Sequence, residues 1–182
     1  MPGGGTRTFL EPDHYEAGLS QAQIQAVILP RDEFKARLTW AELHHSQVLR
    51  CEEDAPRVAY LQLAPGLAFI TFTADSGPLP VWRGTEMQAG DIVFHGRGER
   101  LHQFTPGPFV WNVIAMDSAQ LEHYGRALSG TPFSLPSEGR TLRPLNALQR
   151  VCDACTRESV ASLRQSPRSC PILRSRGRWN RV

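Results

Sequence analysis

The chain has 182 residues and a formal net charge of only +2, which fits one domain with an additional segment and does not indicate a nucleic-acid surface over the whole chain. Hydrophobic residues make up 41% and charged residues 21% of it, so a folded core is expected and general disorder is not. No run of about 18 apolar residues is present to span a membrane. The start of the sequence lacks the pattern of a secretory signal, so we expect a cytoplasmic protein whose four cysteines are reduced.

The N-terminal half reads as a polar arm followed by many short strands. Residues 1–20 begin with glycines and contain Pro12, and we predict that they form a flexible arm. From residue 23 onward, roughly eight apolar runs follow within about 95 residues, separated by proline and glycine turns. The clearest are "VAYLQL" and "LAFITFT", which are rich in β-branched and aromatic residues. This spacing predicts a mainly β sandwich or barrel.

The strand from residue 67 onward has two different faces. Because side chains alternate along a strand, Phe69, Thr71 and Thr73 share one face. Ile70 and Phe72 share the other. The second face can pack a core, whereas the threonine face can be exposed to water or line a polar cavity.

The stretch "DIVFHGRGERLHQF", residues 91–104, predicts a hairpin with two histidines. With "GRG" as a three-residue loop, His95 lies opposite Glu99 and on the other face from His102. With "GRGE" as a four-residue loop, the histidines become diagonal neighbours, roughly 7–8 Å apart, and Arg100 points into the same place. An arginine beside a cation is unfavourable, so we expect no metal shared by these histidines.

The C-terminal third changes to a helical pattern. A helix is predicted from Asp117 or Ser118, as N-cap, to Gly130. Residues 131–143 read as a proline-rich linker, and a second helix is predicted over residues 144–166. Its apolar and small positions follow three- and four-residue steps typical of a helix-packing face, which we assign to a dimer interface. These positions include Leu145, Leu148, Cys152 and Cys155. The arginine-rich residues 167–182 are expected to be disordered.

Taken together, the arm, the strands, "AGDIVFHGRGERLHQ" and "IAMDSAQLEHYGRALSG" resemble the N-terminal sensor domain of AraC-type transcription regulators. The resemblance covers roughly residues 20–165 and implies a cupin-like (jelly-roll) β-barrel over residues 21–130, including the first helix. It also implies helices that form a homodimer and a C-terminal DNA-binding domain with two helix-turn-helix units. Nothing after Pro167 is long enough for that domain, so we expect a fragment or a truncated gene product.

A ligand pocket inside the barrel is the expected functional site. Its candidate lining residues are the large amphipathic side chains of the strands, and Trp82 and Trp111 stand out because a buried indole N–H needs a partner. The candidates are Phe69, Phe72, Trp82, His95, His102 and Trp111.

Metal binding and catalysis have little support in the sequence. There is no His-x-His pair of the kind common in metal-binding cupins, and His44 and His45 would point to opposite faces of a strand. Cys152 and Cys155 lie within a predicted helix without two further zinc ligands nearby. No nucleophile elbow or H-E-x-x-H motif is present. We therefore predict no metal, no cofactor and no enzymatic activity.

The sequence thus predicts the effector-sensing and dimerisation region of an AraC-type regulator, binding an unknown small molecule and contacting DNA only through a domain outside this chain. Two alternatives remain open. One is a metal-dependent cupin enzyme of the dioxygenase or isomerase type, and the other is a dimerisation module without a ligand.

Overall fold

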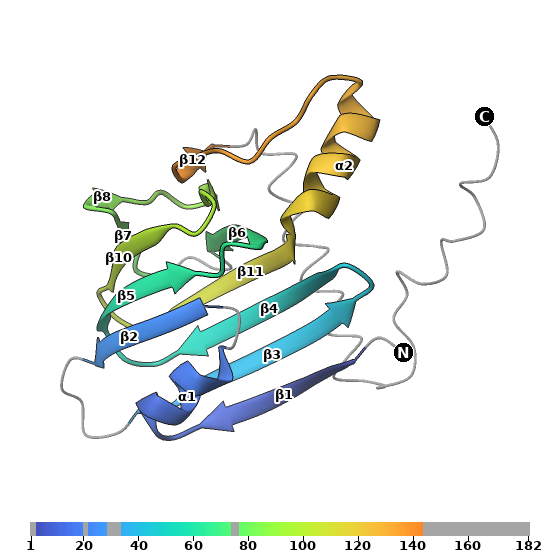
Figure 1. Cartoon of the computed structure of the whole chain (residues 1–182). Helices are drawn as coiled ribbons and strands as arrows, with labels where there is room; N and C mark the ends of the chain where they lie inside the picture. The colour runs from blue at the N-terminus through green and yellow to red at the C-terminus, as the bar shows by residue number, and fades with distance from the viewer. Residues whose placement is uncertain (1–2, 20–21, 29–33, 74–76, 144–182) are drawn as a thin grey trace.

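Two antiparallel sheets form the body of the protein (Figure 1). The computed structural model describes residues 3–19, 22–28, 34–73 and 77–143. In chain order the elements are β1 (Gly4–Phe9), α1 (Pro12–Gly18), β2 (Ala22–Ile28), β3 (Ala36–Leu43), β4 (Ser46–Glu53), β5 (Arg57–Leu63), β6 (Leu67–Thr73), β7 (Val81–Trp82), β8 (Thr85–Glu86), β9 (Ile92–Phe94), β10 (Arg100–Thr105), β11 (Phe109–Asp117), α2 (Ser118–Ser129) and β12 (Arg140–Leu142).

The strand order gives each sheet a continuous inner face. One sheet has seven strands in the order β1-β3-β4-β11-β6-β9-β12, and the other has five in the order β2-β5-β10-β7-β8. Alternation along β4 turns Leu49, Cys51 and Glu53 inward, where they are buried. Residues of β11 and β6 pack beside them, and the apolar core fills the space between the sheets. The predicted mainly β, cupin-like fold is confirmed.

The helix that follows the strands has the predicted limits. Asp117 is the N-cap, and its side chain accepts a hydrogen bond of 2.9 Å from the backbone N–H of Gln120. Gly130 ends the helix with φ +69°, a conformation in which glycine carries no steric penalty. Helix α2 continues directly from β11, with no loop between them.

The N-terminal segment differs from the predicted flexible arm. Strand β1 pairs with β3 from Gly4 opposite Ala41 to Phe9 opposite Ala36. Helix α1 then lies against β1, β2 and β3 (Figure 1). Its Tyr15 side chain is buried. Proline at the start of the helix is compatible with a first turn, where its missing N–H is not needed. A polar, glycine-rich composition concealed the alternation that lets Phe9 reach the core.

The predicted hairpin around "GRG" is wrong. Strand β9 pairs with β6 and β12 in the seven-stranded sheet, whereas β10 pairs with β5 and β7 in the five-stranded sheet. The turn between them therefore connects the two sheets. Gly98 has φ +62°, which suits this turn. The 131–143 segment is also more ordered than a linker, because β12 pairs with β9.

The second predicted helix (144–166), with its dimer-interface residues Leu145, Leu148, Cys152 and Cys155, and the tail (167–182) lie outside the described residues. Within the described ranges, no helix is long and apolar enough to cross a membrane.

Candidate functional site

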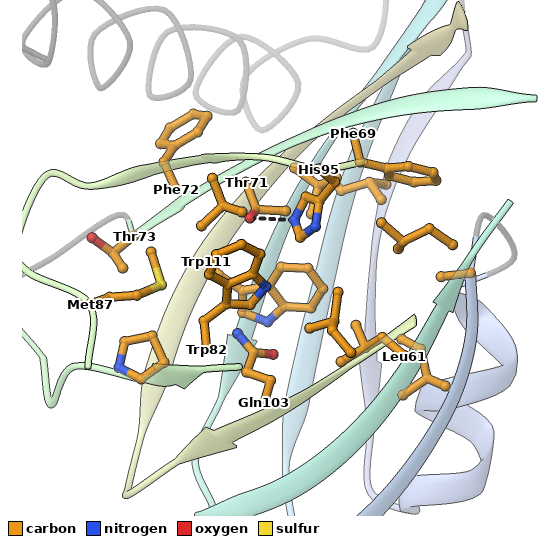
Figure 2. Close-up of a pocket in the computed structure, with 18 of the residues that line it drawn as sticks. Leu61, Phe69, Thr71, Phe72, Thr73, Trp82, Met87, His95, Gln103 and Trp111 are labelled. Carbon is orange, nitrogen blue, oxygen red and sulfur yellow. Dashed lines mark hydrogen bonds between the residues drawn. The ribbon is translucent and has the colours of Figure 1, made fainter. Parts of the chain in front are cut away.

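An apolar cavity lies between the two sheets (Figure 2). Its walls come from β4, β6, β9 and β11 on one side and from β2, β5, β7 and β10 on the other. Its cavity volume is about 50 Å³, within a hollow of about 700 Å³ that includes the opening to solvent. One water needs roughly 10–15 Å³ by this measure. The cavity in this conformation therefore suits a small ligand.

Five of the six residues predicted to line a pocket border this cavity: Phe69, Phe72, Trp82, His95 and Trp111. The sixth, His102, is exposed on the outer face of the five-stranded sheet, where its ring lies 5.2 Å from that of Tyr60. The two histidines face apart, as the three-residue loop predicts, but the cause is different. His95 follows a strand of one sheet and His102 lies on a strand of the other.

The threonine face of β6 is the one that meets the cavity. Phe69, Thr71 and Thr73 line it, while Ile70 does not. Phe72 also borders the cavity, although Figure 2 shows its ring directed away from the other labelled side chains. The lining residues of the opposite sheet include Leu61 and Leu101, so the cavity is largely apolar and not the polar cavity that the threonines alone indicate.

Two polar residues of the wall, Thr71 and His95, belong to a hydrogen-bonded chain that ends at Glu99 behind the wall. His95 Nε2 lies 2.9 Å from Thr71 Oγ1 (Figure 2), and His95 Nδ1 lies 3.0 Å from Glu99 Oε2. An ionised carboxylate only accepts hydrogen bonds, so Nδ1 carries the proton. Bonds at both ring nitrogens, to Thr71 and to Glu99, fix the orientation of the His95 ring.

Glu99 is held in its ionised form. Its own burial raises its pKa, but this is outweighed by the hydrogen bond and charge of His95, by the backbone N–H of Gly96 at 3.1 Å and by Arg83 at 3.3 Å. The net pKa of Glu99 is lowered from its ordinary value. Its negative charge is thus balanced before any ligand enters.

A second polar network is centred on Glu53 and connects the cavity wall to α1. Trp111 Nε1 donates to Glu53 Oε1 at 2.8 Å, and the hydroxyl of Tyr15 donates to the same oxygen at 2.7 Å. The Arg57 guanidinium forms a buried ion pair with Glu53 and donates through Nη2 to Gln103 Oε1 at 3.4 Å. Burial alone lowers the pKa of Arg57, but the charge of Glu53 outweighs it and the net pKa is raised.

Sequence reasoning missed Tyr15, Glu53 and Arg57. A signal for Glu53 was present, because it shares the period-two face of Leu49 and Cys51. Tyr15 had no comparable signal, since its burial depends on the folding of α1 against distant strands.

The two tryptophans of the cavity differ in their hydrogen bonding. Both are 7% exposed. Trp111 donates to Glu53, whereas Trp82 Nε1 is buried with no hydrogen-bond partner among the residues that the structure describes. Trp82 lies edge-on to His95, with ring centroids 5.9 Å apart. A buried donor without an acceptor is unfavourable, so this N–H is an exception among the buried polar groups of the wall.

The residues considered as metal ligands are dispersed. His44 and His45 form the turn between β3 and β4, and not a strand, and their rings contact each other at 5.1 Å. Across the described ranges, no group of three or more histidine, cysteine, aspartate or glutamate side chains is close enough to hold a metal ion.

Comparison with known proteins gives a fold and no sequence family. No family model matches the chain, and no curated protein sequence matches it. Among solved structures, the AraC-like transcriptional activator CuxR superposes with a TM-score of 0.57 at 13% identity, covering 89% of this chain and 62% of that chain. The present chain thus spans about three fifths of that activator's length. At this identity the likeness concerns the fold alone: the chain has an AraC-like, cupin-like fold.

Two further structures are more distant. Procruciferin, an 11S globulin from Brassica napus, gives a TM-score of 0.29 at 15% identity, over 71% of this chain and 35% of that one. Salicylate 1,2-dioxygenase from Pseudoaminobacter salicylatoxidans gives 0.24 at 11% identity, over 92% of this chain and 56% of that one. Scores this low carry no argument about function.

Proposed function

We propose that this chain is the effector-sensing region of an AraC-type bacterial transcription regulator and that it binds a small molecule in the cavity between its sheets. The observation that carries the proposal is the cavity itself, enclosed by both sheets of an AraC-like fold. Its wall contains a buried indole N–H that has no partner in the described part of the chain. In a wall that serves packing alone, buried polar groups are expected to be hydrogen-bonded within the protein.

Contacts around the cavity connect the proposed ligand site to the helices α1 and α2. Trp111 borders the cavity and shares the carboxylate of Glu53 with Tyr15, which lies on α1. Trp111 also lies on β11, which continues into α2. Suppose that the protein has two states, which differ in the positions of Trp111, α1 and α2. A ligand that binds one of these states more tightly then shifts the equilibrium toward that state.

Homodimer formation is part of the proposal. The helix that the sequence assigns to this role, residues 144–166, follows β12 and lies outside the described residues. Sedimentation of the full chain at several concentrations tests it: a concentration-dependent shift to twice the monomer mass is expected, and a monomer at all concentrations contradicts it.

A thermal-shift screen with small neutral metabolites, combined with metal analysis of the purified chain, tests the function. We expect at least one compound to raise the unfolding temperature in proportion to the logarithm of its concentration. Stoichiometric iron, manganese or zinc would instead indicate the metal-dependent cupin enzyme. A chain that binds no compound and no metal but dimerises would be a dimerisation module.

A further inference from the structure

We infer, on the basis of the proposed sensing function, that the cavity ligand is a small, uncharged, largely apolar molecule with one hydrogen-bond acceptor, which receives the N–H of Trp82. The inference names the chemical class of the ligand, and three features of the cavity carry it.

The first feature is the lining of the cavity. Among the residues that the structure describes, the lining contains no aspartate, glutamate, lysine or arginine side chain. A charged ligand would lose its hydration without gaining an opposite charge, which is unfavourable in an apolar enclosure. The nearest charges are already paired: Glu99 with Arg83 and His95, and Glu53 with Arg57. The ligand is therefore uncharged.

The second feature is the hydrogen-bonding capacity of the wall. The Thr71 hydroxyl is bonded to His95, and the Trp111 N–H is bonded to Glu53. Trp82 Nε1 is buried, lies on a residue of the wall and has no partner in the described part of the chain. The other buried nitrogen in this condition, Arg57 Nη1, belongs to a residue outside the cavity lining. Among the fully buried polar atoms of the lining that the structure describes, Trp82 Nε1 is thus the one without a partner, and as a donor it calls for an acceptor on the ligand.

The third feature is the size of the cavity. The space open to water-sized molecules is about 50 Å³, enough for roughly three to five waters. We expect a ring of about six or seven heavy atoms to fit once side chains move. A sugar with several hydroxyl groups would meet a lining that is mostly apolar and would leave hydroxyl groups unpaired. The indole of Trp82 offers a flat apolar surface for such a ring.

The test uses two isosteric probes, cyclohexanone and methylenecyclohexane, which differ in a carbonyl oxygen against a methylene carbon. Affinities are measured by calorimetry or ligand-detected NMR on the full chain and on Trp82→Phe, which keeps an aromatic ring and removes the N–H. We expect the substitution to weaken cyclohexanone by about tenfold, the size of one lost hydrogen bond. Methylenecyclohexane should bind both proteins equally or prefer the variant.

Trp111→Phe is the matched control. It also removes an indole N–H from the cavity wall, but one that already has Glu53 as its acceptor. It should lower stability and change the affinities of the two probes by the same factor. In the absence of ligand, Trp82→Phe should be as stable as the parent or more so, because it removes a buried donor without a partner.

A second measurement does not depend on the variant folding. In the parent protein, the indole N–H proton resonance of Trp82 should move downfield with cyclohexanone and not with methylenecyclohexane. Equal effects of both probes at Trp82, or tighter binding of cyclohexanecarboxylate than of cyclohexanone, overturn the ligand class while leaving the cavity as the sensing site. Failure of both probes to bind overturns the inference, and a metabolite that stabilises the protein in the thermal screen then still supports the proposed function.

Discussion

Trp111 Nε1 donates a hydrogen bond of 2.8 Å to Glu53, and this contact joins the ligand cavity to the polar network beneath α1. The carboxylate receives two neutral donors and a guanidinium while almost fully buried, at 4% exposed for the residue. Such a group is stable only when every partner is present. The network therefore ties the N-terminal segment, the cavity wall and β5 into one unit.

Glu53→Gln is expected to lower the free energy of unfolding by about 3–5 kcal/mol, because it leaves the buried Arg57 without a counter-charge. Urea denaturation measures the change. Glu52→Gln is the control, since Glu52 points to the outer face and pairs there with Arg37 and Arg50; it should cost less than about 1 kcal/mol. Equal losses from the two substitutions would contradict the assignment of Glu53 as the centre of the network.

Tyr15→Phe is expected to cost about 1.5–3 kcal/mol, because it removes a hydrogen bond to a charged acceptor in a buried site. Hydrogen exchange gives the more specific readout, with faster exchange at the amides of α1 than in β4 and β11. Tyr60→Phe, on the outer face of the five-stranded sheet, should change stability by less than about 0.5 kcal/mol. Uniform exchange throughout the chain after Tyr15→Phe would show that α1 is not held by this contact.

Asp91 gives a prediction for acid stability. Its burial raises its pKa, but the hydrogen bonds from Arg143 at 2.9 Å and from the backbone of Gln88, with the charge of Arg143, lower the net value below the ordinary 3.8. A carboxyl whose pKa is lower in the folded state stabilises the protein above its unfolded pKa. That contribution is lost as the pH falls through the lower, folded value.

Asp91→Asn should therefore flatten the loss of unfolding free energy as the pH falls from about 4.5 to 2.5. Chemical denaturation at several pH values provides the slope, which is independent of the stability of the variant at neutral pH. A slope identical to that of the parent protein would contradict the ion pair between Asp91 and Arg143.

Gly139 lies so close to the cavity wall that a side chain there has no room. An added Cβ would come within 2.5 Å of a Glu99 oxygen and 2.7 Å of Trp82 Cζ2. Gly139→Ala is expected to cost about 1–3 kcal/mol through overpacking and to weaken ligand binding by displacing Trp82. Gly66→Ala, whose methyl group meets nothing within 4 Å, is the control. Unchanged ligand affinity in Gly139→Ala would show that Trp82 is not part of the binding surface.

The sequence predicts the strands well where alternation and turn residues agree. The face of Phe69, Thr71 and Thr73 lines the cavity, as local patterns indicate. Helix α2 likewise begins directly after its N-cap Asp117 and ends before Gly130. These features depend on residues close together in the chain. Five of the six candidate pocket residues border one cavity, because large amphipathic residues in or beside the strands pack between the sheets.

The predictions from the sequence fail where the structure depends on pairing between strands that are far apart in the chain. A glycine turn between two strand-like runs predicts a hairpin. In the structure, however, β9 pairs with β6 and β12, whereas β10 pairs with β5 and β7. That choice also leaves His102 outside and His95 inside. The N-terminal arm is likewise ordered by its pairing with β3, which its own polar sequence does not reveal. Local propensity cannot rank such long-range alternatives.

The most direct test of the sensing account is a map of backbone and indole N–H chemical shifts with a compound that stabilises the protein. We predict the largest changes at Trp82 and Trp111, with further changes along β11 into α2 and at Tyr15 of α1. Changes confined to the outer face, around Tyr60 and His102, would contradict it, because the compound would then bind outside the cavity and without contact to the Glu53 network.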